Sequence, residues 1–186
     1  MWYAGVGSRN TPPWVLMTMT KIAIKMSLLG YVLRSGGAKG ADTAFEQGVL
    51  EGMKEIYYAD NFIPYGSVDG KRVPYDPNVF EQAKAIAGQF HPAWNAVRMD
   101  GTPVVKDYPK RLHGRNAFQI LGVNLTEPAS FCICWTPDAV STHSQRRQST
   151  GGTGTAISIG DHYKVPIINL ANPSENAKWT EWAHAI

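Results

Sequence analysis

The stretch Ser35-Gly36-Gly37-Ala38-Lys39-Gly40-Ala41-Asp42 has the residue types of a phosphate-binding turn. Glycine lacks a Cβ, so it tolerates positive φ angles and lets a ligand approach the backbone closely. A helix is predicted from Asp42 onward, and its unpaired N–H groups and positive dipole end suit an anion. Lys39 adds a full positive charge at the same place. The stretch therefore predicts a phosphate cradle, although similar glycines also occur in turns that merely join a strand to a helix.

Two further glycine-containing turns precede predicted helices. Gly7-Ser8-Arg9 follows the apolar run of residues 1–6, and Gly151-Gly152-Thr153-Gly154-Thr155 ends a long polar loop. Thr136, which directly follows the strand predicted at 130–135, belongs to the same set of candidates. Strands that alternate with helices favour a parallel sheet, and such sheets bind ligands outside the carboxyl ends of their strands. We therefore expect these turns to converge on one anion.

Arg115 and Asn116 lie in the most basic part of the chain, residues 108–116. They are expected to begin a helix that continues over residues 117–123. Side chains at the start of a helix can reach a neighbouring phosphate or sugar, whereas a basic run by itself commonly forms a solvated face. We expect both residues to border the same pocket as the glycine turns.

The elements that position these residues follow from hydrophobic periodicity and turn signals. Thr11 is expected to cap the first helix, which Pro12 and Pro13 open and Gly30 ends. Strands are expected at residues 1–6, 31–33, 54–59, 130–135 and 165–170, and helices at 11–29, 42–50, 78–87, 117–123, 157–162 and 174–184. The pattern predicts one α/β domain over residues 1–186, with a mainly parallel sheet flanked by helices.

The composition argues against several classes of protein. With 44% hydrophobic and 18% charged residues among 186, the chain is globular and long enough for a sizeable core. A net charge of +3 permits nucleotide or nucleic-acid partners without requiring them. Cys132 and Cys134 are expected to be buried, reduced thiols without a disulfide or a metal. No apolar run approaches the roughly 18 residues of a membrane span. No signal-peptide pattern is present either, so we expect a cytoplasmic protein without a membrane partner, metal or cofactor.

Other residues give weaker signals. His91 and His113 have no spacing that supports a catalytic role, so each is interpreted as structural. Tyr65 and Tyr75 follow prolines in a segment rich in glycine, proline and aspartate. These tyrosines could stack on a nucleotide base or pack the loop against the body of the protein.

In order and spacing, the motifs resemble the SLOG superfamily over roughly residues 3–170. The matching stretches are Gly5-Val6-Gly7-Ser8-Arg9, residues 35–42, Arg115-Asn116 and residues 151–156. This superfamily includes the DNA-processing protein DprA (Smf), the YpsA-like proteins and the Lonely-guy phosphoribohydrolases. The first two stretches are most similar to DprA, with Lys39 and Ala41 in place of its arginine and isoleucine. The resemblance implies a Rossmann-like sheet, a pocket for nucleotide-type ligands and frequent homo-oligomers, and similar stand-alone proteins occur in phages.

One departure from the superfamily concerns catalysis. The phosphoribohydrolases carry Pro-Gly-Gly-x-Gly-Thr-x-x-Glu, whose glutamate takes part in cleaving the N-glycosidic bond. This chain has Thr150 at the proline position and Ser158 at the glutamate position. A hydroxyl cannot supply a carboxylate's charge to an oxocarbenium-like transition state. Glu46 is the only nearby carboxylate that could replace it, and a helix surface or a dimer contact is an equally good interpretation of Glu46.

Three functions follow from these motifs. The preferred one is binding of a nucleotide-derived, phosphate-bearing ligand without catalysis. The first alternative is DprA-like binding of single-stranded DNA through a basic strip of Lys106, Lys110, Arg111, Arg115, Arg146 and Arg147. The second is a nucleotide N-glycosidic hydrolase or transferase with a displaced carboxylate. The modest net charge favours the small ligand over DNA, and the retained glycines argue against a protein that has lost its pocket.

Overall fold

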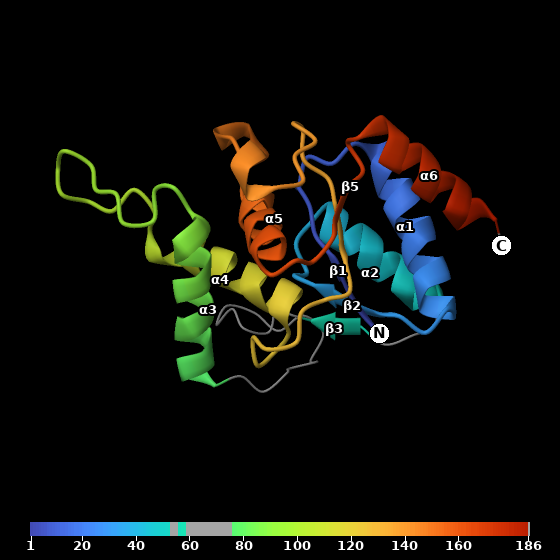
Figure 1. The fold of residues 1–186 in the computed structure, drawn as a ribbon, viewed down its shortest axis with the longest axis horizontal. Coiled ribbons are helices and arrows are strands. Elements are labelled where there is room, and N and C mark those ends of the chain that lie inside the picture. Colours follow the sequence, from blue (N-terminus) through green and yellow to red (C-terminus); the bar gives the residue numbers. More distant parts are fainter. Residues whose placement is uncertain (53–55, 59–75, 186) are drawn as a thin grey trace.

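The computed structural model describes residues 1–52, 56–58 and 76–185, and it contains a five-stranded parallel sheet in the order β3-β2-β1-β4-β5 (Figure 1). The strands are β1 (Trp2–Gly5), β2 (Val32–Ser35), β3 (Ile56–Tyr58), β4 (Cys132–Cys134) and β5 (Ile167–Asn169). The predicted α/β class, with a parallel sheet flanked by helices as in Rossmann-like folds, is therefore confirmed. That the whole chain forms one domain stays a prediction.

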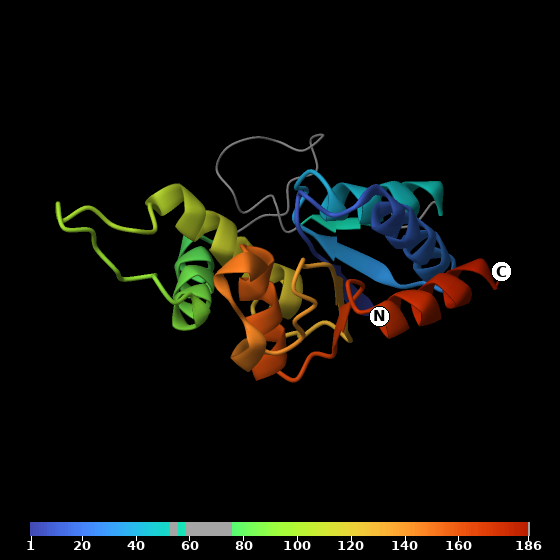
Figure 2. The ribbon, with the colours of Figure 1, turned by 90° about the horizontal axis from the view of Figure 1, so that it is seen from above.

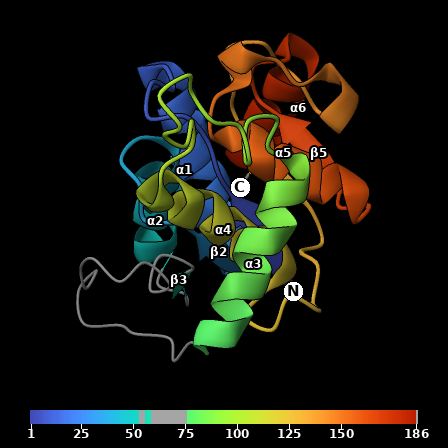
Figure 3. The same cartoon turned by 90° about the vertical axis from the view of Figure 1, so that its left-hand side faces the viewer.

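Helices cover both faces of the sheet (Figure 1). The helices are α1 (Pro13–Leu28), α2 (Ala41–Glu51), α3 (Pro77–Phe90), α4 (Asp107–Leu121), α5 (Thr153–His162) and α6 (Pro173–His184). Successive strand residues point to opposite faces. Tyr3 and Ile133 therefore pack with α1, α2 and α6, whereas Ala4 and Cys132 pack with α3, α4 and α5. In Figure 3, α3 and α4 face the viewer, and the segment between them projects away from the sheet in Figures 1 and 2.

The strand order reverses at β1, which lies at the centre of the sheet. After β1 the chain passes through α1 to β2 and β3 on one side, and later returns to place β4 and β5 on the other. The register pairs Ala4 of β1 with Arg34 of β2 and with Cys132 of β4. Open parallel sheets bind ligands beyond the carboxyl ends of their strands at such a reversal. The loops after β1, β2 and β4 all leave the sheet at this edge.

Proline opens the first helix as predicted, but the predicted cap, Thr11, is wrong. Helix α1 begins at Pro13 with Pro12 as its N-cap, and no side chain caps it. The hydroxyl of Thr11 instead donates to the carbonyl oxygen of Ser8 at 2.7 Å. Thr11 therefore stabilises the turn after β1 rather than the helix.

The predicted start of the helix that carries Arg115 and Asn116 is also wrong. Helix α4 begins at Asp107, so both residues lie well inside it. Pro109 falls in the first turn, where its missing N–H costs no hydrogen bond. Gly114 allows close packing on α3, because a Cβ there would lie 2.9 Å from Cγ of Lys84. Tertiary packing thus extends the helix through a proline and a glycine that suggested a loop.

Some predictions fall on residues outside the described ranges. These are the roles of Tyr65 and Tyr75 and the ends of the strand predicted at 54–59, of which residues 56–58 are described.

Two predictions from the composition can be compared with the described residues. Cys132 and Cys134 are buried and free of disulfides, as predicted. Among the described helices, none combines the length and the hydropathy needed to cross a membrane.

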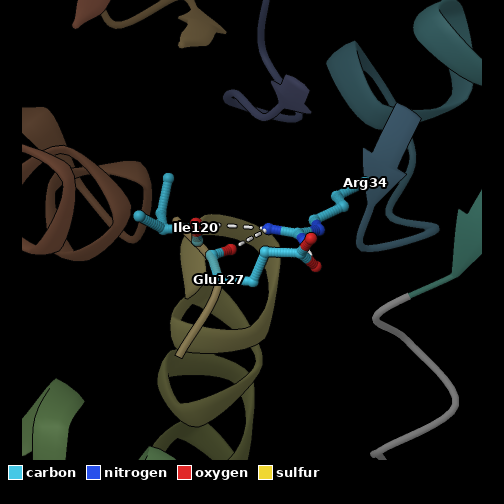
Figure 4. A network of polar contacts seen from close by, with 3 residues as sticks. All are labelled: Arg34, Ile120 and Glu127. Atoms are coloured by element: carbon cyan, nitrogen blue, oxygen red, sulfur yellow. Dashed lines mark hydrogen bonds and ion pairs between the residues drawn. The ribbon is translucent and has the colours of Figure 1, made fainter. Parts of the chain in front are cut away.

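Arg34 is a fully buried cation on the central part of the sheet, with 1% of its surface exposed. Its guanidinium donates to the backbone oxygen of Glu127 at 2.6 Å and to the carboxylate of the same residue at 2.9 Å (Figure 4). The indole of Trp2 lies 4.7 Å from the guanidinium carbon. Arg34 therefore links β2 to the loop that follows α4, and its role is structural.

Candidate functional site

The first glycine turn, residues 36–40, is anchored at its base by Ser35. The Ser35 hydroxyl donates to the carboxylate of Glu46 and accepts a bond from the N–H of Gly37 at 3.3 Å. Gly37 has a φ of +66°, which favours glycine. The half-buried Glu46, the candidate for a displaced catalytic carboxylate, thus holds this turn in place.

Protein atoms fill the space beside two glycines of the first turn. A Cβ at Gly36 would lie 2.7 Å from Nε of Arg115 and 2.8 Å from Oδ2 of Asp42. A Cβ at Gly40, whose φ is +93°, would lie 2.8 Å from the carbonyl oxygen of Ser8. These glycines therefore allow close packing against the rest of the protein. This close packing is enough to explain why both positions are glycine, without a ligand beside them.

The second glycine turn is open. Apart from the adjoining residues of the chain, no described atom lies within 4 Å of the position that a Cβ would take at Gly151 or at Gly152. Gly151 has a φ of +65°, and Gly152 is the N-cap of α5 with ordinary helical angles. The turn therefore exposes backbone at the positive end of a helix, which is the local geometry that binds anions.

Helix α4 connects the two glycine turns. Nη1 of Arg115 donates to the carbonyl oxygen of Gly36 at 2.7 Å, and Nδ2 of Asn116 donates to that of Gly152 at 3.1 Å. The structure thus brings together the two turns and the Arg-Asn pair that the sequence singled out. Whether these residues bind a ligand stays a prediction.

Hydrogen bonds of Thr136 and Asp138 fix the loop after β4. Thr136 is completely buried, and its hydroxyl accepts a bond from Nδ2 of Asn169 at 2.7 Å. Asp138 accepts bonds from the hydroxyls of Ser149 at 2.9 Å and Thr150 at 2.5 Å. These bonds hold the polar loop in a conformation that places Gly151 at the carboxyl edge of the sheet. Thr136, a predicted ligand contact, lies within this support.

A cavity of about 930 Å³ lies beside the second turn. Its described lining is Gln89, Phe90, His91, Pro92, Ala93, Val104, Val105, His113, His143, Arg146, Arg147, Gln148, Gly151 and Gly152. These described lining residues include two arginines and three histidines but no aspartate or glutamate. Of the predicted ligand residues only Gly151 and Gly152 are among those described as lining it. Arg9 and Lys39 are exposed on the other turns.

Sequence reasoning missed a polar network in the wall of this cavity. The rings of His91 and His113 meet edge to face with centroids 4.5 Å apart. Nδ1 of His113 lies 2.9 Å from Oγ1 of Thr155, which also accepts a bond from Nη2 of Arg146 at 3.2 Å. Nη1 of Arg146 donates to the carbonyl oxygen of Phe90 at 2.6 Å. No local motif joins residues 91, 113, 146 and 155, so the sequence carried no signal for this network.

The electrostatics of this network favour neutral imidazoles. Burial, the His91 ring and the charges of Arg146 and Arg115 together lower the pKa of His113 to about 4. Burial and the charge of Arg146 also lower the pKa of His91. No carboxylate contributes to either shift. Among the described residues that line it, the cavity therefore has the positive charges of Arg146 and Arg147 and no carboxylate to balance them.

His143 and Ser158 contact each other but do not form an activated nucleophile. Nδ1 of His143 lies 2.9 Å from Oγ of Ser158, which donates its own proton to the carbonyl oxygen of Gly154 at 2.8 Å. Ser158 is completely buried. Ser158, which stands where the phosphoribohydrolases have their glutamate, is therefore buried within α5.

We expect the stability of the protein to fall in acid partly through His113. An unfolded histidine has a pKa of about 6.5. Below that pH the unfolded chain binds this proton more readily than the folded chain does, so stability declines from about pH 6.5 toward about pH 4. After a discount for partial exposure, this group accounts for a loss of about 2 kcal/mol at pH 4.5.

Urea unfolding of the wild type and of His113→Asn at pH 7.5 and 4.5 measures this contribution. An asparagine oxygen can replace Nδ1 as the acceptor from Thr155, so the variant keeps that contact but has no titrating group. The variant should lose about 2 kcal/mol less than the wild type between the two pH values. Parallel losses in the two proteins would contradict the assignment.

Comparison of the chain with protein-family models, curated proteins and solved structures finds no match. The resemblance to the SLOG superfamily therefore rests on the motifs themselves. Within the described part of the chain, no group of three or more histidine, cysteine, aspartate or glutamate side chains could hold a metal ion.

Proposed function

We propose that this protein binds a nucleotide, or a closely related phosphate-bearing molecule, in the cavity beside Gly151 and Gly152 and does not turn it over. The observation that carries the proposal is the lining of that cavity: Arg146, Arg147 and three histidines without a described carboxylate. The cavity adjoins the open N-terminus of α5. Charge-assisted hydrogen bonds from arginine and from helix N-terminal N–H groups are the standard means of holding phosphate.

Size and lining also suit a nucleoside. Pockets for small molecules and cofactors have volumes of about 300–1,000 Å³, and this cavity has a volume of about 930 Å³. The described lining includes the rings of Phe90 and three histidines. The ring of Phe90 packs against His143 at 5.8 Å and against His162 at 5.3 Å between centroids. A base can stack on such rings while the phosphate occupies the glycine turn.

The two alternative functions have less support. A single-stranded DNA site needs several free cations along a strip. Here Arg111 pairs with Asp107 at 2.8 Å, and Arg115 donates to the carbonyl oxygen of Gly36 at 2.7 Å. An N-glycosidic hydrolase needs a carboxylate at the sugar. The cavity lining described here has none, and Ser158 is enclosed. Membership of the SLOG superfamily and assembly into homo-oligomers remain part of the proposal.

The variant Gly152→Ala tests the proposed phosphate position. Its backbone angles suit alanine, and the new methyl group enters open space, so the fold is expected to be unchanged. The methyl group would occupy the place of the phosphate oxygens, and we expect nucleoside monophosphate affinity to fall at least about tenfold. Calorimetric titration of the purified proteins measures the affinities, and thermal unfolding checks the fold.

Two outcomes would contradict the proposal. One is that the wild type binds none of the four ribonucleoside monophosphates. The other is that Gly152→Ala binds them as tightly as the wild type does. Tight binding of a labelled single-stranded oligonucleotide, falling steeply with salt, would favour the DprA-like alternative instead.

A further inference from the structure

His91 and His113 form a pre-assembled pair of rings in the cavity wall. His91 is the C-cap of α3 and His113 lies in α4, so the packing of these two helices creates the pair. The indole of Trp94 packs against both rings, at 6.0 Å from His91 and 6.2 Å from His113. The two imidazoles are thus held in place without a ligand.

Hydrogen bonds determine which nitrogen of each neutral ring carries the proton. Nδ1 of His91 accepts a bond from the N–H of Ala93 at 3.2 Å, so the proton of that ring is on Nε2. The Thr155 hydroxyl is completely buried, and its described partners are Arg146, which can only donate, and Nδ1 of His113, so the hydroxyl proton goes to Nδ1. The proton of His113 is then also on Nε2.

Both Nε2–H groups are available to a ligand. Neither has a hydrogen-bond partner among the described residues, and neither atom is enclosed. A metal would need the lone pair of Nε2, which would force a proton onto Nδ1 and break the bond from the N–H of Ala93. The pair therefore presents two hydrogen-bond donors, and these suit an anion or another acceptor.

Helix α4 contacts the glycine turn and supplies His113 of the imidazole pair at two points along its length. Asn116 contacts the carbonyl oxygen of Gly152, and His113 contacts the side chain of Thr155. His113 and Asn116 are three residues apart, so they lie on the same face of the helix about one turn, or about 5 Å, from each other. One group of donors is at the glycine turn, and the other is the imidazole pair beside Arg146.

We propose that His91 and His113 form a subsite for a second phosphoryl group, so that the ligand is a nucleotide with two linked phosphoryl groups, such as a nucleoside diphosphate. This inference rests on the proposed function, because it places the first phosphoryl group at Gly151 and Gly152. Because His113 and Asn116 are about one helical turn apart, the imidazole pair and the glycine turn lie close enough for two linked phosphoryl groups to reach both. The positive charges of Arg146 and Arg147 have no described carboxylate in the cavity to neutralise them, and a second phosphoryl group supplies that charge.

The test compares mono- and diphosphates of the four ribonucleosides on the full chain by calorimetric titration at pH 7.5. The wild type should bind at least one diphosphate about tenfold more tightly than its monophosphate. His91→Asn and His113→Asn keep an acceptor in place of Nδ1 but remove the Nε2–H donor. Each should weaken diphosphate binding about fivefold and leave monophosphate binding within about twofold. His184→Asn on α6, which lies away from the cavity, is the matched control and should change neither.

Each outcome bears on a separate claim. Equal affinity for mono- and diphosphates in the wild type would overturn the second subsite and leave the proposed function standing. Equal losses for both ligands in the His91 and His113 variants would also overturn it, because the pair would then be structural. Binding of no nucleotide would overturn both proposals. The wild-type comparison decides the question even if a variant fails to fold.

Discussion

Replacing Arg34 with methionine is expected to lower the free energy of unfolding by about 3 kcal/mol. The guanidinium is buried and donates to the backbone oxygen of Glu127 at 2.6 Å and to its carboxylate at 2.9 Å (Figure 4). Methionine can fill the volume of the stem but supplies no donor. The backbone carbonyl of Glu127, in the loop after α4, would then lose this donor, which is the main cost.

Chemical unfolding of Arg34→Met and Glu127→Gln separates the contributions. The Glu127 side chain is 64% exposed, so its charge is largely screened by water. Glu127→Gln keeps the backbone oxygen that Arg34 contacts, and it should cost about 1 kcal/mol or less. If Glu127→Gln proved as costly as Arg34→Met, the ion pair rather than the backbone contact would dominate.

Replacing Arg146 with methionine is expected to weaken nucleotide binding at least about 100-fold. Arg146 lines the cavity, and its guanidinium is already oriented by the carbonyl oxygen of Phe90 and the hydroxyl of Thr155. A cation held in this way has little side-chain entropy left to lose when an anion binds. Its removal eliminates one of the two arginine charges described in the lining.

Three further variants make this expectation specific. Arg147→Met removes an exposed cation at the same cavity, and we expect a loss of about tenfold. Arg146→Lys keeps the charge without the planar fork and should fall between the wild type and Arg146→Met. Arg98→Met changes an exposed arginine on the projecting segment, outside the described lining, and should have no effect. Calorimetric titration measures each affinity, and wild-type binding by Arg146→Met would contradict the assigned role.

The sequence by itself determined the class of the fold and most of its elements. Helix α1 carries Val15, Met19, Ile22 and Met26 at helical spacing, and all four are buried. The strands are short apolar runs that glycine or polar residues end. Such patterns are local, because each element must present one apolar face to the core whatever its neighbours are. The free, buried Cys132 and Cys134 could be predicted for the same reason.

The sequence also singled out the glycine turns at residues 36–40 and 151–155 and the Arg115-Asn116 pair. It could not show whether each of them faces a ligand or packs against the rest of the protein. Whether Gly36 faces a ligand or Arg115 depends on where α4 lies across the carboxyl edge of the sheet. The helix itself starts earlier than predicted, since its packing on α3 outweighs the local effects of Pro109 and Gly114. Local propensity is weak compared with the burial of a helix face, so tertiary contacts decided both points.

The cavity and its histidine pair were decided by tertiary structure alone. His91 and His113 belong to different elements, and no local motif joins them. Only the packing of α3 on α4 brings their rings to 4.5 Å, and only the position of α5 gives them Thr155 and Arg146 as neighbours. Their lowered pKa values arise from burial and from charges contributed by separate elements. A sequence pattern records which residues are present along the chain, whereas burial and electrostatic interactions depend on distances that exist only after folding.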